Sequence, residues 1–205
     1  MRINNFLTTG VLLGFAVTVT AAPVNFTFLE NGLGNLGSSS TFTESGISLT
    51  AYAGPSGQQL YAKNEGPGET GLGTASDSQF EINPNNFVQL NAATSPATEI
   101  TTLYFGSIQT ATLGEKVDIY YSTTLGTLGT LLGTVSGVGS SVTGSFDLTG
   151  WGYTSGYYGI TAGQGNIELG GATVNSLTVP DAASTAALLG GAVMTLGCLR
   201  RKLMV

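Results

Sequence analysis

The chain has 205 residues, of which only 9% are charged, and its formal net charge at pH 7 is −6. It contains no histidine and one cysteine, Cys198. This excludes Ser-His-Asp triads, Cys-His pairs and the usual zinc hydrolases, because each of them needs an imidazole. Two lysines against eleven acidic residues between positions 22 and 178 give a net charge of −9. Nucleic acid is therefore excluded as a partner, since nothing there neutralises phosphates.

The first predicted element is a signal peptide over residues 1–21. Arg2 supplies the basic start, residues 6–19 are the apolar segment, and Val19-Thr20-Ala21 is a small-residue cleavage site. Cleavage one residue later would place Pro23 directly after the cut, where its missing N–H and fixed φ are poorly tolerated. Ala22 is therefore the expected new N-terminus. The alternative is an uncleaved N-terminal anchor, which the short apolar segment disfavours.

Residues 22–178 are predicted to form one extracytoplasmic, all-β domain. Glycine, serine, threonine and asparagine dominate this region, and β-branched and aromatic residues recur in short bursts, as in strands joined by turns. This pattern favours an antiparallel β-sandwich or jelly roll. A disordered stalk is the alternative, which nine Phe and eight Tyr disfavour. The predicted strands are 24–30, 40–43, 47–53, 59–63, 79–82, 87–91, 99–105, 116–122, 130–135, 141–148, 157–161, 165–169 and 173–179.

Two of these segments alternate between apolar and polar residues, as half-buried strands require. Residues 47–53 place Ile47 and Leu49 on one face, and residues 116–122 place Val117 and Ile119 on one face. The segment 125–134 repeats Leu-Gly-Thr three times. Its period of three fits neither a strand nor a helix, so we interpret it as a flexible hairpin loop that enters a strand near Leu131.

An acidic, glycine-rich segment covers residues 60–82. Its glycines allow positive φ and close backbone approach, and they bring Glu65, Glu69, Asp77 and Glu81 near one loop. Four carboxylates with backbone carbonyls between them suit calcium, which takes six to eight oxygens. The alternative is a solvated acidic turn in which Glu69 and Glu81 accept hydrogen bonds from the loop's own N–H groups.

Paired carboxylates are the only catalytic groups left to consider, as in glycoside hydrolysis. Glu69 with Glu81, or Glu115 with Asp118, are the candidate pairs. Nothing in their spacing requires this chemistry, so surface carboxylates are the favoured interpretation.

An aromatic cluster follows Leu148 and consists of Trp151, Tyr153, Tyr157 and Tyr158. Exposed aromatic rings can stack on sugars, which makes these four residues candidates for carbohydrate binding. Packing in the core or a corner of a sandwich is the more frequent role of such a cluster.

The last predicted element is a transmembrane helix. Residues 182–199 contain no charge and would span about 27 Å as a helix, close to the hydrocarbon thickness of a bilayer. Arg200, Arg201 and Lys202 follow it and indicate a cytoplasmic C-terminus. The alternative is a buried helix at the end of a globular domain, which a basic cluster at the extreme terminus disfavours.

The tail as a whole resembles the sorting signal of PEP-CTERM-class substrates of exosortase. Val179, Pro180 and Asp181 precede the apolar stretch, and the resemblance is closest to the Val-Pro-Asp-Ser-Gly variant, although Ala182-Ala183 replace Ser-Gly. It implies a membrane-embedded cysteine transpeptidase that removes the helix and transfers the protein to an envelope or matrix component. It also implies a Gram-negative bacterium that makes exopolysaccharide.

The body is also similar to exported proteins of that class. The shared features are a Gly-Glu-x-Gly-Leu-Gly loop, here residues 68–73, and a following Glu-Ile, here Glu81-Ile82. Later segments, 107–109 with 114–120 and 160–162 with 165–167, extend this resemblance. It implies a β-sandwich of unknown biochemical role and supplies no catalytic residues.

The sequence therefore predicts three parts: the signal peptide (1–21), the β-sandwich domain (22–178) and the sorting signal (179–205). The expected protein is a non-enzymatic component of the cell surface or extracellular matrix, structural or adhesive in exopolysaccharide or biofilm. It is held transiently in the inner membrane before sorting. A carbohydrate-binding module is the first alternative, and a carboxylate-dependent glycosidase is the second. No cofactor is expected, with calcium as the one candidate ion.

Overall fold

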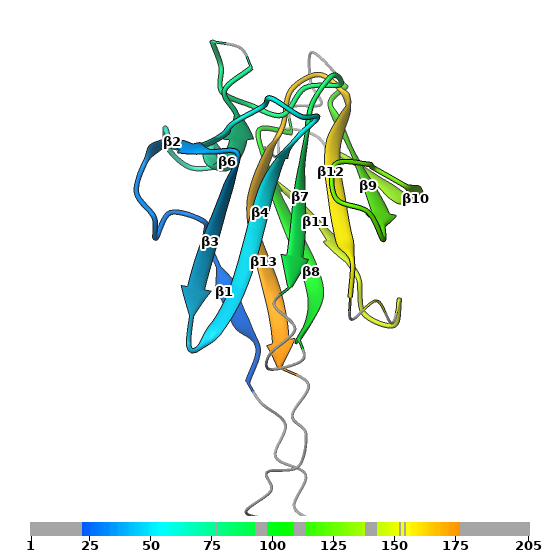
Figure 1. Ribbon diagram of the computed structural model, residues 1–205. Helices are drawn as coiled ribbons and strands as arrows, with labels where there is room; N and C mark the ends of the chain where they lie inside the picture. The colour runs from blue at the N-terminus through cyan, green and yellow to red at the C-terminus, as the bar shows by residue number, and fades with distance from the viewer. Residues whose placement is uncertain are drawn as a thin grey trace, which may run out of the picture. The chain divides into compact units, whose positions relative to one another are not determined.

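The computed structural model describes residues 22–76, 78–92, 98–108, 114–137, 143–151, 153 and 155–176. All regular secondary structure in these residues is β-strand, arranged as two antiparallel sheets (Figure 1). The predicted all-β class and the β-sandwich are thereby confirmed. No helix long and apolar enough to cross a membrane occurs in this part of the chain. The predicted signal peptide, the sorting signal and Asp77 lie outside the described residues.

The first sheet, called sheet A, has seven strands. Its order is β11 (Gly144–Asp147), β8 (Thr98–Gly106), β13 (Glu168–Ser176), β6 (Thr70–Thr74), β5 (Leu60–Asn64) and β2 (Gly34–Gly37), with β1 (Val24–Phe26) also paired to β13. One edge of β13 follows β8 along its length. The other edge is shared, since Leu169 pairs with β6 and Val174 pairs with β1.

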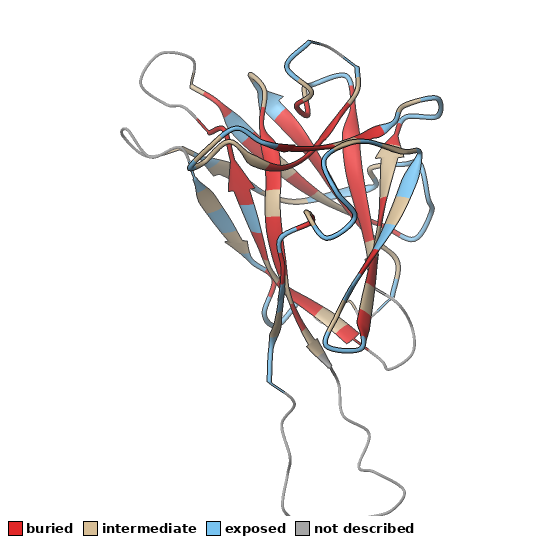
Figure 2. Ribbon diagram, turned by 90° about the vertical axis from the view of Figure 1, so that its left-hand side faces the viewer, coloured by how far each residue is buried: buried red, intermediate tan, exposed pale blue. Residues whose placement is uncertain are grey.

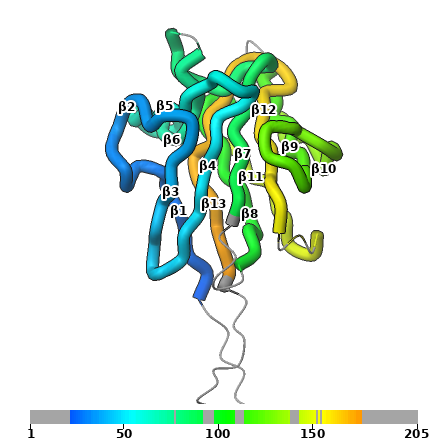
Figure 3. Tube along the Cα trace, in the orientation of Figure 1, coloured from blue at the N-terminus to red at the C-terminus, as the bar shows by residue number. Residues whose placement is uncertain are grey.

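The second sheet, sheet B, has six strands. Its order is β10 (Thr130–Ser136), β9 (Lys116–Ser122), β12 (Tyr157–Gln164), β7 (Phe87–Ala92), β4 (Ile47–Gly54) and β3 (Ser39–Glu44). Consecutive strands lie in different sheets at β2–β3, β4–β5, β6–β7, β7–β8, β8–β9, β10–β11, β11–β12 and β12–β13, and the path of the chain can be followed in Figure 3. Strands that are neighbours in a sheet are therefore often far apart in the sequence.

The core lies between the two sheets, where the buried residues gather (Figure 2). Ile47 and Leu49 of β4 are buried, as are Val117 and Ile119 of β9. The alternation predicted for these two strands is confirmed. Residues 22–178 contain no cysteine, so burial of apolar surface, about 25 cal/mol per Å², is the main force that holds the sheets together.

Several predicted strand boundaries are wrong for local reasons. The predicted strand 24–30 ends at Phe26, because Phe28 has a φ of +63° and turns the chain while its ring fills the core. Residues 79–82 form only an isolated bridge from Ile82 to Ile167, since Phe80 also has a positive φ. The predicted strands 165–169 and 173–179 are one strand, β13, with a register shift between Leu169 and Gly171.

Two strands were not predicted. Strand β2 and strand β6 are rich in glycine, and β6 lies within the Gly-Glu-x-Gly-Leu-Gly segment predicted to be a loop. The hairpin prediction for 125–134 is confirmed, because β9 and β10 pair in antiparallel fashion and β10 begins at Thr130.

Candidate functional site

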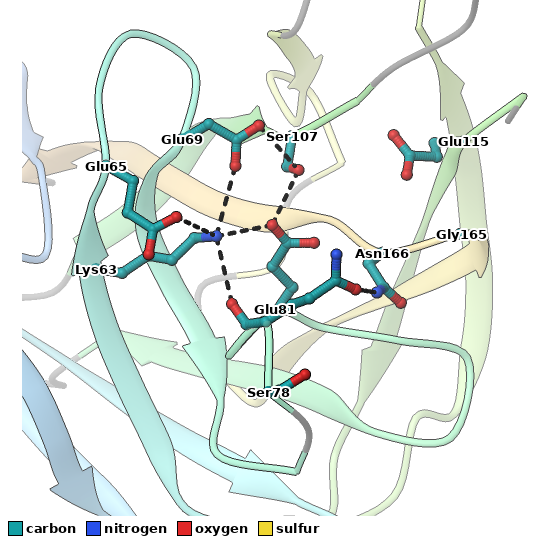
Figure 4. Close-up of a pocket in the computed structure, with 10 residues that line it drawn as sticks. Lys63, Glu65, Glu69, Ser78, Glu81, Ser107, Glu115, Gly165 and Asn166 are labelled. Carbon is teal, nitrogen blue, oxygen red and sulfur yellow. Dashed lines mark hydrogen bonds and ion pairs between the residues drawn. The ribbon is translucent and has the colours of Figure 1, made fainter. Parts of the chain in front are cut away.

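A buried lysine surrounded by four glutamates lies on the outer face of sheet A, the face turned away from the core. The Nζ atom of Lys63 is 2.8 Å from Glu81 Oε1 and 2.8 Å from Glu168 Oε1. Glu69 and Glu65 approach the same atom at 3.5 and 3.6 Å (Figure 4). These five residues are called the Lys63 cluster. Lys63 and Glu81 are each 5% exposed and Glu168 is fully buried, so these three charges depend on one another, whereas the Glu65 carboxylate is 65% exposed to water.

Glycines of β6 create the space for this cluster. Leu72 points into the core, while Gly71 and Gly73 leave the outer face of β6 without side chains. A Cβ atom at Gly73 would lie 2.8 Å from Glu81 Cα and would also collide with the Phe80 carbonyl. The segment that carries Glu81 can therefore lie directly on the sheet, where the Phe80 ring stacks on Tyr61 at 3.9 Å.

The turn between β5 and β6 and the end of β8 complete the cluster. The Ser107 N–H donates a hydrogen bond to the Gly68 carbonyl at 2.7 Å, which ties that turn to the residue after β8. The Ser107 hydroxyl donates its one proton to Glu81 Oε1 at 3.1 Å, and Glu69 Oε1 lies 3.4 Å from the same hydroxyl oxygen. Ser107 has a φ of +55°, a left-handed conformation that is uncommon for serine.

The electrostatics of the cluster keep Lys63 protonated. Burial by itself lowers the pKa of Lys63, but the hydrogen bond to Glu81 and the charges of Glu81, Glu65 and Glu69 outweigh it, so its pKa lies above 10.5. Burial raises the pKa of Glu81, and the hydrogen bond and charge of Lys63 oppose that rise only in part. The ammonium is thus the charge that makes burial of these carboxylates tolerable.

Within the Lys63 cluster, Glu168 is the carboxylate whose burial is offset by the fewest polar contacts. Its Oε1 atom is ion-paired with Lys63, but its Oε2 atom has no hydrogen-bond partner among the described residues. A buried polar atom without a partner is costly, so the Lys63 ammonium is the main stabilising contact of this carboxylate.

A polar cavity of about 420 Å³ opens beside the cluster. Glu65, Glu69 and Glu81 form one wall, and Glu115 lies across the cavity from Lys63 in Figure 4. Glu115 is only 5% exposed. The Asn166 amide donates to the Gln79 side chain at the rim. The cavity is therefore lined mainly by acceptors and by one cation that is already engaged.

The structure brings together three of the four candidate calcium ligands. Glu65, Glu69 and Glu81 surround Lys63, whereas Asp77 lies outside the described residues. Glu69, Glu81 and Glu168 each offer a carboxylate oxygen within 4.8 Å of the others. A calcium ion at this position would have to displace the Lys63 ammonium. The alternative, a solvated acidic turn, is wrong for Glu81, because this residue is 5% exposed.

The two candidate pairs for glycoside hydrolysis have different surroundings. Glu69 and Glu81 lie close together, but both carboxylates contact the Lys63 ammonium, at 3.5 and 2.8 Å. Glu115 lines the cavity, whereas Asp118 of β9 accepts a hydrogen bond from Thr134 at 2.6 Å within sheet B. That second pair is not assembled at the cavity.

The predicted aromatic cluster divides between core and surface. Tyr158 is buried and its hydroxyl donates to the Tyr153 carbonyl at 3.1 Å. Tyr157 packs edge to face against another tyrosine of sheet B. Trp151 is 41% exposed and lies beside Tyr153, whose ring stacks on Tyr121 at 3.8 Å.

Sequence reasoning missed Lys63, Ser107 and Glu168 as members of one site. The usable signal was Lys63, one of only two lysines between positions 22 and 178 and located in the most acidic segment. No signal in the sequence links Glu168 to that segment, because the link depends on β13 lying next to β6.

No family model, no curated protein and no solved structure matches this chain. The site is therefore interpreted from its own geometry.

Proposed function

We propose that this chain is an exported protein that an exosortase-type membrane transpeptidase sorts to the cell surface or extracellular matrix. There the β-sandwich serves a structural or adhesive role in exopolysaccharide or biofilm. The observation that carries the proposal is the order of features in the tail: Val179-Pro180-Asp181, then the uncharged residues 182–199, then Arg200, Arg201 and Lys202. The basic, apolar and small-residue segments of residues 1–21 support export.

The Lys63 cluster supports a role without catalysis. Its two most buried carboxylates, Glu81 and Glu168, each hold the Lys63 ammonium at 2.8 Å. A proton-transfer catalyst needs a group that is free to exchange protons with a substrate. These groups instead join β5, β13 and the segment before β7 as an ionic clamp.

For the finer architecture we propose a jelly-roll-like sandwich. The repeated change of sheet between consecutive strands, eight times among β1 to β13, supports it.

Mass spectrometry of protein recovered from the cell surface tests the sorting proposal. The expected product begins at Ala22, lacks Leu203-Met204-Val205 and carries an adduct at its new C-terminus. A matched variant, Asp181→Ala, should keep the tail and stay in the membrane fraction. Surface material with an intact C-terminus would contradict the proposal.

Carbohydrate binding at Trp151 is a second candidate function. The specific observation is that the indole is 41% exposed beside the stacked rings of Tyr153 and Tyr121. Trp151 is the only tryptophan in the chain, so its fluorescence reports this position alone. A change in emission on titration with polysaccharide would support the candidate. A glycosidase would instead release chromophore from aryl glycosides, and Glu69→Gln would abolish that release.

A further inference from the structure

A second cleft lies on the outer face of sheet A, on the other side of the β5–β6 turn from the Lys63 cluster. It has a volume of about 580 Å³, within the range of about 300–1,000 Å³ that is usual for ligand pockets. Tyr104 of β8 lines it and is 42% exposed, although Leu103 and Phe105 on either side are buried in the core. The tyrosine ring is thus presented on the outer face by the alternation of the strand.

The Tyr104 ring is held in a fixed position by a relay across three strands. Its hydroxyl lies 3.1 Å from Thr173 Oγ1 of β13, and Thr173 Oγ1 donates to Asn25 Oδ1 of β1 at 2.7 Å. Since the threonine proton is directed at Asn25, the tyrosine hydroxyl is the donor in the first bond. A ring fixed in this way loses little conformational freedom when a ligand packs against it.

Small residues flank the ring on both neighbouring strands. Gly171 of β13 and Ser145 of β11 are the residues in register with Tyr104. A Cβ atom at Gly171 would lie 3.7 Å from Tyr104 Cδ2 and 2.6 Å from the Phe26 carbonyl. Gly171 has no side chain because the Phe26 carbonyl of β1 occupies that position, so backbone rather than a bulky side chain borders the ring on that side.

The lining of the cleft carries no charge. All eleven lining residues are described, and none is acidic or basic. Four of them are glycines, and besides Tyr104 four carry an aliphatic hydroxyl group: Thr27, Thr70, Thr143 and Ser145. The body as a whole carries a net charge of −9, so an anionic ligand would be repelled and would meet no cation in the cleft.

We propose that this cleft, named the Tyr104 cleft, binds a segment of a neutral polysaccharide, with the Tyr104 ring stacked on the apolar face of a sugar. The protons of the Thr27 and Thr70 hydroxyls are directed at acceptors of the chain itself, so their oxygens are positioned to accept hydrogen bonds from sugar hydroxyl groups, which both donate and accept. The open cleft suits a chain that continues beyond it. This inference rests on the proposed adhesive role and specifies its site and ligand class.

The test is binding of the full-length chain, in detergent micelles, to dextran, a β-1,3-glucan and a galactomannan, with alginate as the anionic comparison. We expect binding to at least one neutral polysaccharide and none to alginate. Tyr104→Ala should weaken that binding about tenfold. Tyr104→Phe keeps the ring and should weaken it much less. Tyr120→Ala, on β9 of the other sheet, should leave it unchanged.

Three outcomes would overturn the inference. They are binding to none of the neutral polysaccharides, binding to alginate alone, and wild-type affinity in a folded Tyr104→Ala variant. Loss of binding in Trp151→Ala but not in Tyr104→Ala would assign carbohydrate binding to the indole instead. None of these results bears on the processed ends of the protein, so failure here is distinguishable from failure of the sorting proposal.

Discussion

The two cavities on the outer face of sheet A differ in whether charged side chains line them. In the Lys63 cluster, one buried ammonium contacts four carboxylates, of which Glu81 and Glu168 are buried. In the Tyr104 cleft, the lining is uncharged and an aromatic ring is exposed. The β5–β6 turn lies between them, with Glu65 and Glu69 facing one cavity and Gly68 facing the other. We infer from this comparison that the ion pairs of the Lys63 cluster hold the β5–β6 turn in place, whereas the open cleft is available for a ligand.

Removing the central cation should produce the largest effect. Lys63→Met leaves Glu81 and Glu168 buried without their common partner, and breaking a buried ion pair in this way costs about 3–5 kcal/mol. Urea unfolding of the full-length chain at pH 7 measures the loss. Lys116 supplies the matched control, because it is the other lysine of the body and is exposed. Lys116→Met should change the free energy of unfolding by no more than about 0.5 kcal/mol. Equal effects of the two substitutions would show that the cluster is not a clamp.

Alkaline pH should weaken the same contact in the unmodified chain. The pKa of Lys63 is raised in the folded state, because the hydrogen bond to Glu81 and the surrounding carboxylates outweigh the opposing effect of burial. Above pH 10.5 the folded state therefore binds more protons than the unfolded state, and the free energy of unfolding falls as pH rises through the folded pKa. Below pH 10.5 the contribution is fully present. The free energy of unfolding, measured in urea at pH 9 and at pH 11, should fall less between these two pH values in Glu81→Gln than in wild type. Tyr158, whose pKa burial also raises, affects both proteins equally.

Lowering the pH from 7 towards 4 should increase the contribution of Glu81 to the free energy of unfolding. Burial raises its pKa, and Lys63 only partly compensates. The ionised form is therefore less favourable in the folded chain, so stability falls as pH rises from about 4.5 through the folded pKa of Glu81. Thermal unfolding of wild type and Glu81→Gln across pH 4–7 checks this. The difference between the two curves should grow toward pH 7 in favour of Glu81→Gln. Parallel curves would mean that Glu81 titrates normally.

The parts of the fold that the sequence predicted well are those with a strong local signal. Burial alternates over residues 47–52 of β4 and 116–120 of β9, and a period of two is a property of the segment itself. Strand β6, Thr-Gly-Leu-Gly-Thr, offers only Leu72 to the core. It is a strand because β5 and β13 pair with it on both sides. That pairing is not encoded within the segment.

The same distinction applies to the Lys63 cluster. Glu65, Glu69 and Glu81 lie in one short segment, so their proximity could be predicted from spacing. Glu168 joins them only because sheet order places β13 beside β6. Lys63 was visible in the sequence, but its role depends on the glycines of β6, which let the Glu81 segment lie on the sheet. The Tyr104 cleft was not predictable, since it requires Ser145, Tyr104 and Gly171 in register across three strands.

The smallest expected effect concerns calcium, and it decides whether the cluster is a clamp or an ion site. Calcium requires carboxylate oxygens that no other cation occupies, and Lys63 Nζ already contacts four glutamates. We therefore expect the melting temperature of the wild-type chain to be the same in chelator and in millimolar calcium. Lys63→Met removes the competing ammonium but leaves Glu69, Glu81 and Glu168 with oxygens within 4.8 Å of one another. Calcium should then raise the melting temperature of this variant, because a ligand that binds only the folded state stabilises it. A calcium-dependent rise already present in wild type would mean that the ammonium yields its place to the ion, and the clamp would then be one state of a metal site.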